Sequence, residues 1–134
     1  PNEKKSGIPA PILLIGGTYD LITPLLNEQF IIFLSTKSNS LNRFLVIEGA
    51  SHFSPIRVMN NNSDKNKGTD IFKIRDDLIG SHPNDVQNLA IKIILKFLDN
   101  LNDKNGLDVL VKSNENNLIY HLLGEEEIEK ISQF

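Results

Sequence analysis

Pro11-Ile12-Leu13-Leu14-Ile15-Gly16-Gly17-Thr18-Tyr19-Asp20 is the stretch of sequence on which the fold depends. Its apolar run, residues 12–15, is bounded by a proline and two glycines. This pattern is typical of a strand that is covered on both faces, as strands of parallel sheets are. A second run of this kind, residues 44–47, is followed by Glu48-Gly49-Ala50-Ser51-His52-Phe53. The sequence therefore predicts two buried strands, each followed closely by a loop with polar side chains.

The segment between the two runs has the pattern of a helix. Thr23 and Pro24 are typical of an N-cap and a first helical position. Apolar residues then follow at helical spacing: Leu26, Phe30, Phe33 and Leu34. We expect a helix over residues 24–35, and a right-handed crossover through it makes the two strands parallel. The predicted fold class is α/β.

The rest of the chain divides into four parts. Residues 56–70 are hydrophilic and are expected to form a mobile surface loop, and a short amphipathic piece, residues 71–79, is expected to be helical. Residues 83–101 predict a long C-terminal helix that begins at a proline and lies across the sheet. Its apolar positions are Val86, Leu89, Ala90, Ile93, Ile94, Phe97, Leu98 and Leu101. The tail, residues 102–134, contains an apolar stretch at 118–123 and the acidic start of a short helix.

Composition narrows the classes of function. The 134 residues are 40% hydrophobic and 23% charged, which is ordinary for one globular domain with its own core. The net charge of −3 and the scattered lysines and arginines argue against nucleic-acid binding. The chain has no cysteine, which excludes disulfides and thiolate sites within it. Its apolar runs are too short for a membrane span, so a soluble protein is expected; the compartment stays open.

Asp20 and His52 are the candidate functional residues, because neighbouring parallel strands deliver their following loops to the same edge of a sheet. An aspartate there can accept the Nδ1 proton of an imidazole and leave Nε2 free as a base, which is the acid–base half of a catalytic triad. Taken alone, Asp20 fits a turn or a helix cap, and His52 fits a histidine satisfied by backbone or solvent. Their shared position after consecutive strands favours the catalytic interpretation.

The remaining candidates are weaker. His82 precedes a proline and is expected to belong to the turn before the long helix, and His121 lies among apolar residues and is expected to pack. A metal site built from Asp20, His52 and Asp70 is disfavoured, because no two histidines share a ligand spacing. No cofactor is indicated.

A nucleophile is missing from the chain. Ser51 and Ser54 do not qualify, because neither lies in G-x-S-x-G, the strained strand-to-helix turn that exposes a serine hydroxyl beside backbone amides. The motif occurs nowhere in the sequence.

Residues 11–24 and 48–55 resemble the acid and histidine loops of α/β-hydrolases. The first segment is similar to the strand-G-x-x-D-x-x-x-P pattern of that family. The second is similar to its G-A-S-H-F-x-P loop, which is found in cutinase-like, polyester-hydrolase and dienelactone-hydrolase-like members. The likeness is greatest to the C-terminal part of cyanobacterial proteins predicted to be dienelactone hydrolases. It covers residues 9–55 and extends to the helix at 83–101.

The resemblance implies that Asp20 is the triad acid and His52 the triad base of a serine-type carboxylic ester hydrolase. It also implies a nucleophile elbow and an oxyanion hole upstream of Pro1, so this chain is expected to be the inactive C-terminal portion of one α/β-hydrolase domain. In that division, the acid strand and loop span residues 11–23 and the histidine strand and loop span residues 44–55. The expected ligand of the intact protein is an acyl ester or another small molecule.

Two further expectations remain. The alternative function is a non-catalytic α/β domain for interaction or ligand binding, in which Asp20 and His52 are ordinary loop residues. A sheet that lacks its upstream strands would expose an unpaired edge and an apolar face, so we expect the chain to self-associate.

Overall fold

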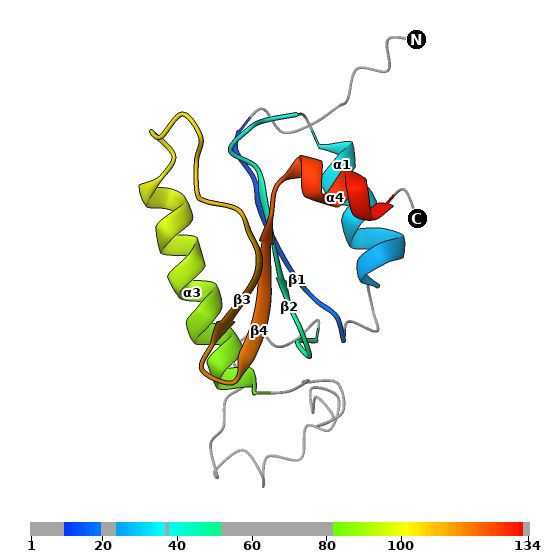
Figure 1. Ribbon diagram of the computed structural model, residues 1–134, viewed down its shortest axis with the longest axis vertical. Coiled ribbons are helices and arrows are strands. Elements are labelled where there is room, and N and C mark those ends of the chain that lie inside the picture. Colours follow the sequence, from blue (N-terminus) through cyan, green and yellow to red (C-terminus); the bar gives the residue numbers. More distant parts are fainter. Residues whose placement is uncertain (1–9, 20–23, 37, 52–81, 133–134) are drawn as a thin grey trace, which may run out of the picture.

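The computed structural model describes residues 10–19, 24–36, 38–51 and 82–132. They form a four-stranded sheet in the order β1-β2-β4-β3, with helices on both faces (Figure 1). Helix α3 covers one face, and α1 and α4 cover the other. The combination of helices and a sheet that the sequence predicts is therefore confirmed, whereas two of the three strand pairings in the described sheet are antiparallel.

The sheet is mixed, and the expectation of a parallel sheet was only partly correct. Strand β1 (Leu13–Gly17) pairs in parallel with β2 (Arg43–Ile47), as the strand–helix–strand pattern predicts. Strand β4 (Leu118–Leu123) is antiparallel to β2 and also to β3 (Leu110–Glu115), which lies at the edge. The difference arises in the tail, which supplies two of the four described strands as a hairpin.

Strand β2 lies in the interior of the sheet and all five of its residues are buried. Leu45 and Ile47 belong to the hydrophobic cluster that α3 covers, whereas Phe44 and Val46 belong to the cluster that α1 and α4 cover. Burial on both faces explains why this strand is a continuous apolar run rather than an alternating one.

The helical segment between β1 and β2 begins one residue later than predicted. A π-helical turn, η1 (Leu25–Gln29), leads into α1 (Phe30–Ser35). Pro24 is the N-cap, with an extended ψ of 138°, and not the first helical residue. Phe30 and Phe33 are buried against Phe44 of β2, with ring centroids 5.4 and 5.6 Å away. These contacts hold the crossover helix against the sheet.

Helix α3 (Pro83–Asp99) is the long amphipathic helix expected from the sequence, two residues shorter at its C-terminus. Its inward residues are Val86, Leu89, Ala90, Ile93 and Phe97. His82 is the N-cap residue, as its place before a proline suggested, and it has left-handed φ and ψ angles of 50° and 56°. Lys92 of α3 and Glu115 of β3 form an ion pair that joins the helix to the strand. The hydrogen bond between the two side chains raises the pKa of Lys92.

The tail is the largest departure from the expected structure. Residues 118–123, expected only as an apolar stretch, form β4, and a tight turn with Asn116 at φ 52° joins it to β3. Helix α4 (Glu125–Ser132) follows Gly124, whose amide donates to the Glu127 carboxylate at 3.1 Å. This hydrogen bond, between residues three positions apart, caps the start of the acidic helix.

Every described helix falls short of the length and apolarity that a bilayer crossing requires. The expected surface loop at 56–70 and the expected short helix at 71–79 lie outside the described residues.

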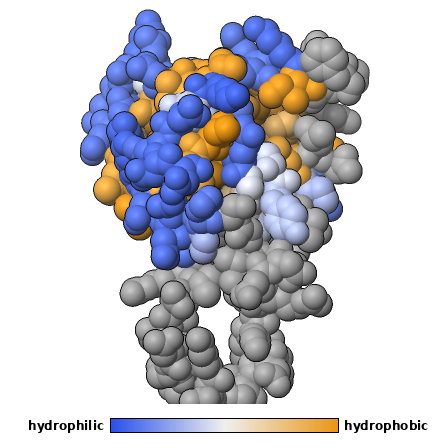
Figure 2. Space-filling model, turned by 60° about the horizontal axis from the view of Figure 1, so that its bottom comes forward, coloured by the Kyte–Doolittle hydropathy of each residue, from blue (hydrophilic) through white to orange (hydrophobic). Residues whose placement is uncertain are grey.

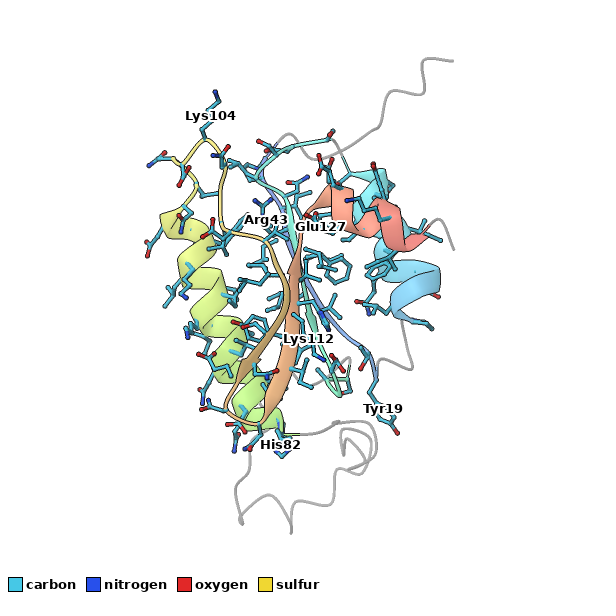
Figure 3. All side chains as sticks on the ribbon, viewed as in Figure 1. Tyr19, Arg43, His82, Lys104, Lys112 and Glu127 are labelled. Carbon is cyan, nitrogen blue, oxygen red and sulfur yellow. The ribbon has the colours of Figure 1, made fainter. Side chains whose placement is uncertain are left out.

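Arg43, the first residue of β2, lies at the end of the sheet near Glu127 (Figure 3). It joins the segment that precedes β2 to the segment that precedes β3. The arginine is only 6% exposed. Its Nε donates to the Leu107 carbonyl at 2.7 Å, and its two terminal nitrogens donate to the carbonyls of Ser40, Asn42 and Asn105, each at 2.8 Å. Burial lowers the pKa of Arg43, while the charges of Glu127 and Asp108 act in the opposite direction. One guanidinium thus satisfies carbonyls from the connections on either side of it.

Replacing Arg43 is expected to destabilise the protein strongly. The Arg43→Met variant leaves several carbonyls without a donor, at a cost of about 3 kcal/mol in the free energy of unfolding. That loss corresponds to a fall of roughly 10 °C in melting temperature, which calorimetry measures. Lys104→Met removes an exposed positive charge from the same connection and is the matched control. Equal melting temperatures for the two variants would contradict this assignment.

Candidate functional site

The carboxyl ends of β1 and β2 lie side by side. The last residue of β1, Gly17, is the register partner of the last residue of β2, Ile47. The chain therefore leaves both strands at the same level of the sheet, at the end that carries Tyr19 and opposite the end that carries Arg43 (Figure 3). This is the placement that two parallel neighbours predict.

Backbone hydrogen bonds join the two loops directly after the strands. The amide of Thr18 donates to the carbonyl of Ile47 at 3.2 Å, and the amide of Tyr19 donates to the carbonyl of Ala50 at 2.9 Å. The Thr18 hydroxyl accepts a hydrogen bond from the amide of Gly49 at 2.9 Å. We call residues 18–19 and 47–50 the loop junction. Three bonds across so short a contact fix the position of one loop relative to the other.

Small residues make the loop junction possible. A Cβ atom on Gly17 would lie 2.1 Å from the carbonyl oxygen of Ala50, so no larger residue fits without moving the backbone. Gly49 has a φ of 79°, a conformation that favours glycine. Close approach of the two loops therefore depends on glycine at both positions.

The histidine loop is also held from its other side, by β4. The amide of Glu48 donates to the carbonyl of Ile119 at 2.9 Å, and a carboxylate oxygen of Glu48 lies 2.8 Å from Nε2 of His121. The second ring nitrogen of His121 contacts the carbonyl of Val111 on β3. The expectation that His121 only packs was therefore incomplete, because its ring bridges β3 and the Glu48 side chain. The sequence signal for this role is its place, one polar residue within an apolar strand.

Asp20 and His52 themselves lie outside the described residues. The structure brings together the residues that precede them: Asp20 follows Tyr19, and His52 follows Ser51, which is buried and 4% exposed. Because Tyr19 is bonded to Ala50, the two candidate residues continue from chain segments that are in contact. The distance between the carboxylate and the imidazole stays a prediction.

Among the described residues, the other ionisable groups near this end of the sheet do not form a second candidate site. Nδ1 of His82 lies 4.0 Å from a carboxylate oxygen of Asp85 within the first turn of α3. Across the described ranges, no three histidine, cysteine or acidic side chains gather as metal ligands would. Asp70, considered with Asp20 and His52 as a metal ligand, is outside those ranges.

Comparisons with protein-family models, with curated proteins and with solved structures give no match to this chain. The features of the chain that bear on its function are therefore the parallel strands, the loop junction and the sequence patterns of the two loops.

Removing the Thr18 hydroxyl is expected to loosen the loop junction. In Thr18→Val the amide of Gly49 loses its acceptor, at a cost of about 1 kcal/mol, so its hydrogen-exchange protection falls several-fold. Thr18→Ser keeps the hydroxyl and is expected to keep the protection. Amide exchange measured by NMR on both variants checks this. Unchanged Gly49 exchange in Thr18→Val would show that the hydroxyl does not hold the loop.

Proposed function

We propose that this chain provides the acid–histidine half of a serine-type carboxylic ester hydrolase of the α/β-hydrolase kind, similar to dienelactone hydrolases. The observation that carries the proposal is the loop junction at the ends of two parallel strands. It holds together the segments that continue into Asp20 and His52. The resemblance of both loops to the family's acid and histidine loops supports the same assignment.

In the proposed mechanism, His52 removes the proton from a serine hydroxyl, which attacks the ester carbonyl and forms an acyl-enzyme. His52 then activates the water that cleaves this intermediate. Asp20 accepts the hydrogen bond from Nδ1 of His52, which sets the tautomer and stabilises the imidazolium as it forms. The chain contains no G-x-S-x-G motif, so the serine and the oxyanion hole must come from a separate segment, and the chain alone is inactive.

The described residues suit the proposed mechanism because they hold the histidine loop from two sides. A triad needs its acid and base held in a fixed relation before substrate arrives, because misplacement costs rate. Here the histidine loop is bonded to the β1 loop through Thr18 and to β4 through Glu48. Such two-sided support is what positioning of a catalytic base requires.

A non-catalytic interaction domain is the second candidate, and one observation favours it. Ile91, Ile94, Leu95 and Leu98 of α3 are between 38% and 56% exposed and lie at helical spacing on one side of the helix. An apolar stripe of this kind is typical of a surface that contacts another protein. The ester assay below separates the two candidates.

The test is hydrolysis of p-nitrophenyl esters by the full-length protein that carries this chain. Asp20→Asn and His52→Ala are expected to lower kcat by at least about 10³-fold, because a triad without its acid or base loses most of its rate. His82→Asn is the control, because His82 lies outside the loop junction and asparagine tolerates its left-handed conformation. Full activity of His52→Ala, or the lack of an elbow motif in the full-length sequence, would refute the proposal.

A further inference from the structure

The ring of His121 lies between two hydrogen-bond acceptors. Its Nε2 is 2.8 Å from a carboxylate oxygen of Glu48, and its Nδ1 contacts the carbonyl oxygen of Val111. An ionised carboxylate and a carbonyl only accept hydrogen bonds, so both ring nitrogens must donate. A neutral imidazole has one N–H group and one lone pair, whereas the imidazolium ion has two N–H groups. The arrangement therefore fits the imidazolium ion and neither neutral tautomer.

The contacts of His121 join three segments that are distant in the sequence. His121 is on β4, Val111 is on β3, and Glu48 directly follows β2 in the loop junction. Val46, the register partner of His121, belongs to the cluster that α1 and α4 cover. Because opposite residues of an antiparallel pair share a face, the imidazole lies on the α1 and α4 face of the sheet. The ring thus connects the β3–β4 hairpin to the first residue after β2.

The pair formed by His121 and Glu48 is open to water. The two side chains are 25% and 42% exposed. Figure 2, in which the end of the molecule with the loop junction is turned forward, shows hydrophilic side chains over much of the described surface. A proton can therefore reach or leave the ring without unfolding of the chain.

Glu48 is the charged partner of the ring. Among the described residues, no other ionised side chain is hydrogen-bonded to His121. Glu48 is therefore the group whose interaction changes most directly when the ring loses a proton. The other charged residues on the elements around this face are Glu28 on η1, Arg43 on β2, Lys112 and Glu115 on β3, and Glu125, Glu126, Glu127, Glu129 and Lys130 on α4.

We propose that His121 forms a pH-sensitive link between the β3–β4 hairpin and the histidine loop. The protonated ring donates to Val111 and to Glu48 at the same time. When the ring loses a proton, one nitrogen presents a lone pair to an oxygen lone pair, so one of the two contacts opens. The attraction between opposite charges at Glu48 is lost whichever contact opens.

The sign of the pH dependence follows from the number of bonds in each form. The protonated ring makes both bonds, so the link is complete at low pH and weakens as pH rises. Histidine side chains change charge between about pH 5 and about pH 8. The link concerns the anchoring of residues 48–50, and it holds whether or not His52 is catalytic.

The test is amide hydrogen exchange, measured by NMR between about pH 5.5 and about pH 8. The probe is the amide of Glu48, which donates to the carbonyl of Ile119 at 2.9 Å. Its protection factor, the intrinsic exchange rate divided by the observed rate at the same pH, is expected to fall about threefold as pH rises, because an exposed ion pair contributes modestly. The amide of Arg43 donates to Ile12 at the opposite end of the sheet and is expected to keep its protection.

Three variants separate His121 from other titrating groups. His121→Gln has an amide that does not titrate, so the fall in protection is expected to disappear. Glu48→Gln keeps the length of the side chain and removes its charge, so the fall is expected to shrink; this variant keeps the test decisive if His121→Gln does not fold. His52→Ala is the matched control, because it removes the other histidine close to residues 48–50 and leaves the link intact. Circular dichroism checks that each variant is folded.

The outcomes are distinct. A fall in Glu48 protection that disappears in His121→Gln and persists in His52→Ala supports the link. A protection factor that does not change with pH in the native chain would overturn the proposal. So would a fall that is unchanged in both Glu48→Gln and His121→Gln, or one that disappears in His52→Ala, because each result assigns the pH dependence to another group.

Discussion

The parallel pairing of β1 with β2 is the constraint on which the rest of the structure depends. It places Gly17 beside Ile47 and so brings the two following loops together at one end of the sheet. It also makes β2 an interior strand, because β4 takes its other edge. The helices on the two faces can then bury Phe44, Leu45, Val46 and Ile47 completely.

Local patterns in the sequence were sufficient for the elements with strong periodicity. The apolar runs at 12–15 and 44–47 correspond to β1 and β2, and the segment 83–101, with apolar residues at helical spacing, corresponds to α3. These predictions were correct because burial produces a recognisable pattern of apolar residues. A strand buried on both faces is a continuous apolar run, and a helix buried on one side has apolar residues at helical spacing. The parallel relation of β1 and β2 followed from the intervening helix.

The elements that were missed depend on contacts between distant residues. Nothing near residues 118–123 shows that this stretch pairs with β2, more than seventy residues earlier, because strand partners are chosen by tertiary packing. The sequence does not distinguish Arg43 from other charged residues, because the carbonyls of Asn105 and Leu107 that it binds belong to a distant segment. The bridging role of His121 has the same origin, since its partners come from β3 and from the end of β2.

For the site, the sequence predicted the meeting of two loops, and the structure supplies the bonds that hold them. The Thr18 hydroxyl was not recognised as an acceptor, because its donor, the amide of Gly49, is thirty-one residues away. From those bonds we predict that Asp20 and His52 lie close together. The loop junction makes this prediction specific, because both residues continue from segments already in contact.

NMR spectroscopy of the histidine ring nitrogens tests the central claim most directly. The signals of His52 are identified from the His52→Ala spectrum. If Asp20 accepts a hydrogen bond from Nδ1 of His52, Asp20→Asn will shift the His52 ring nitrogens and leave those of His82 and His121 unchanged. A His52 spectrum that is identical with and without the Asp20 carboxylate would contradict the account.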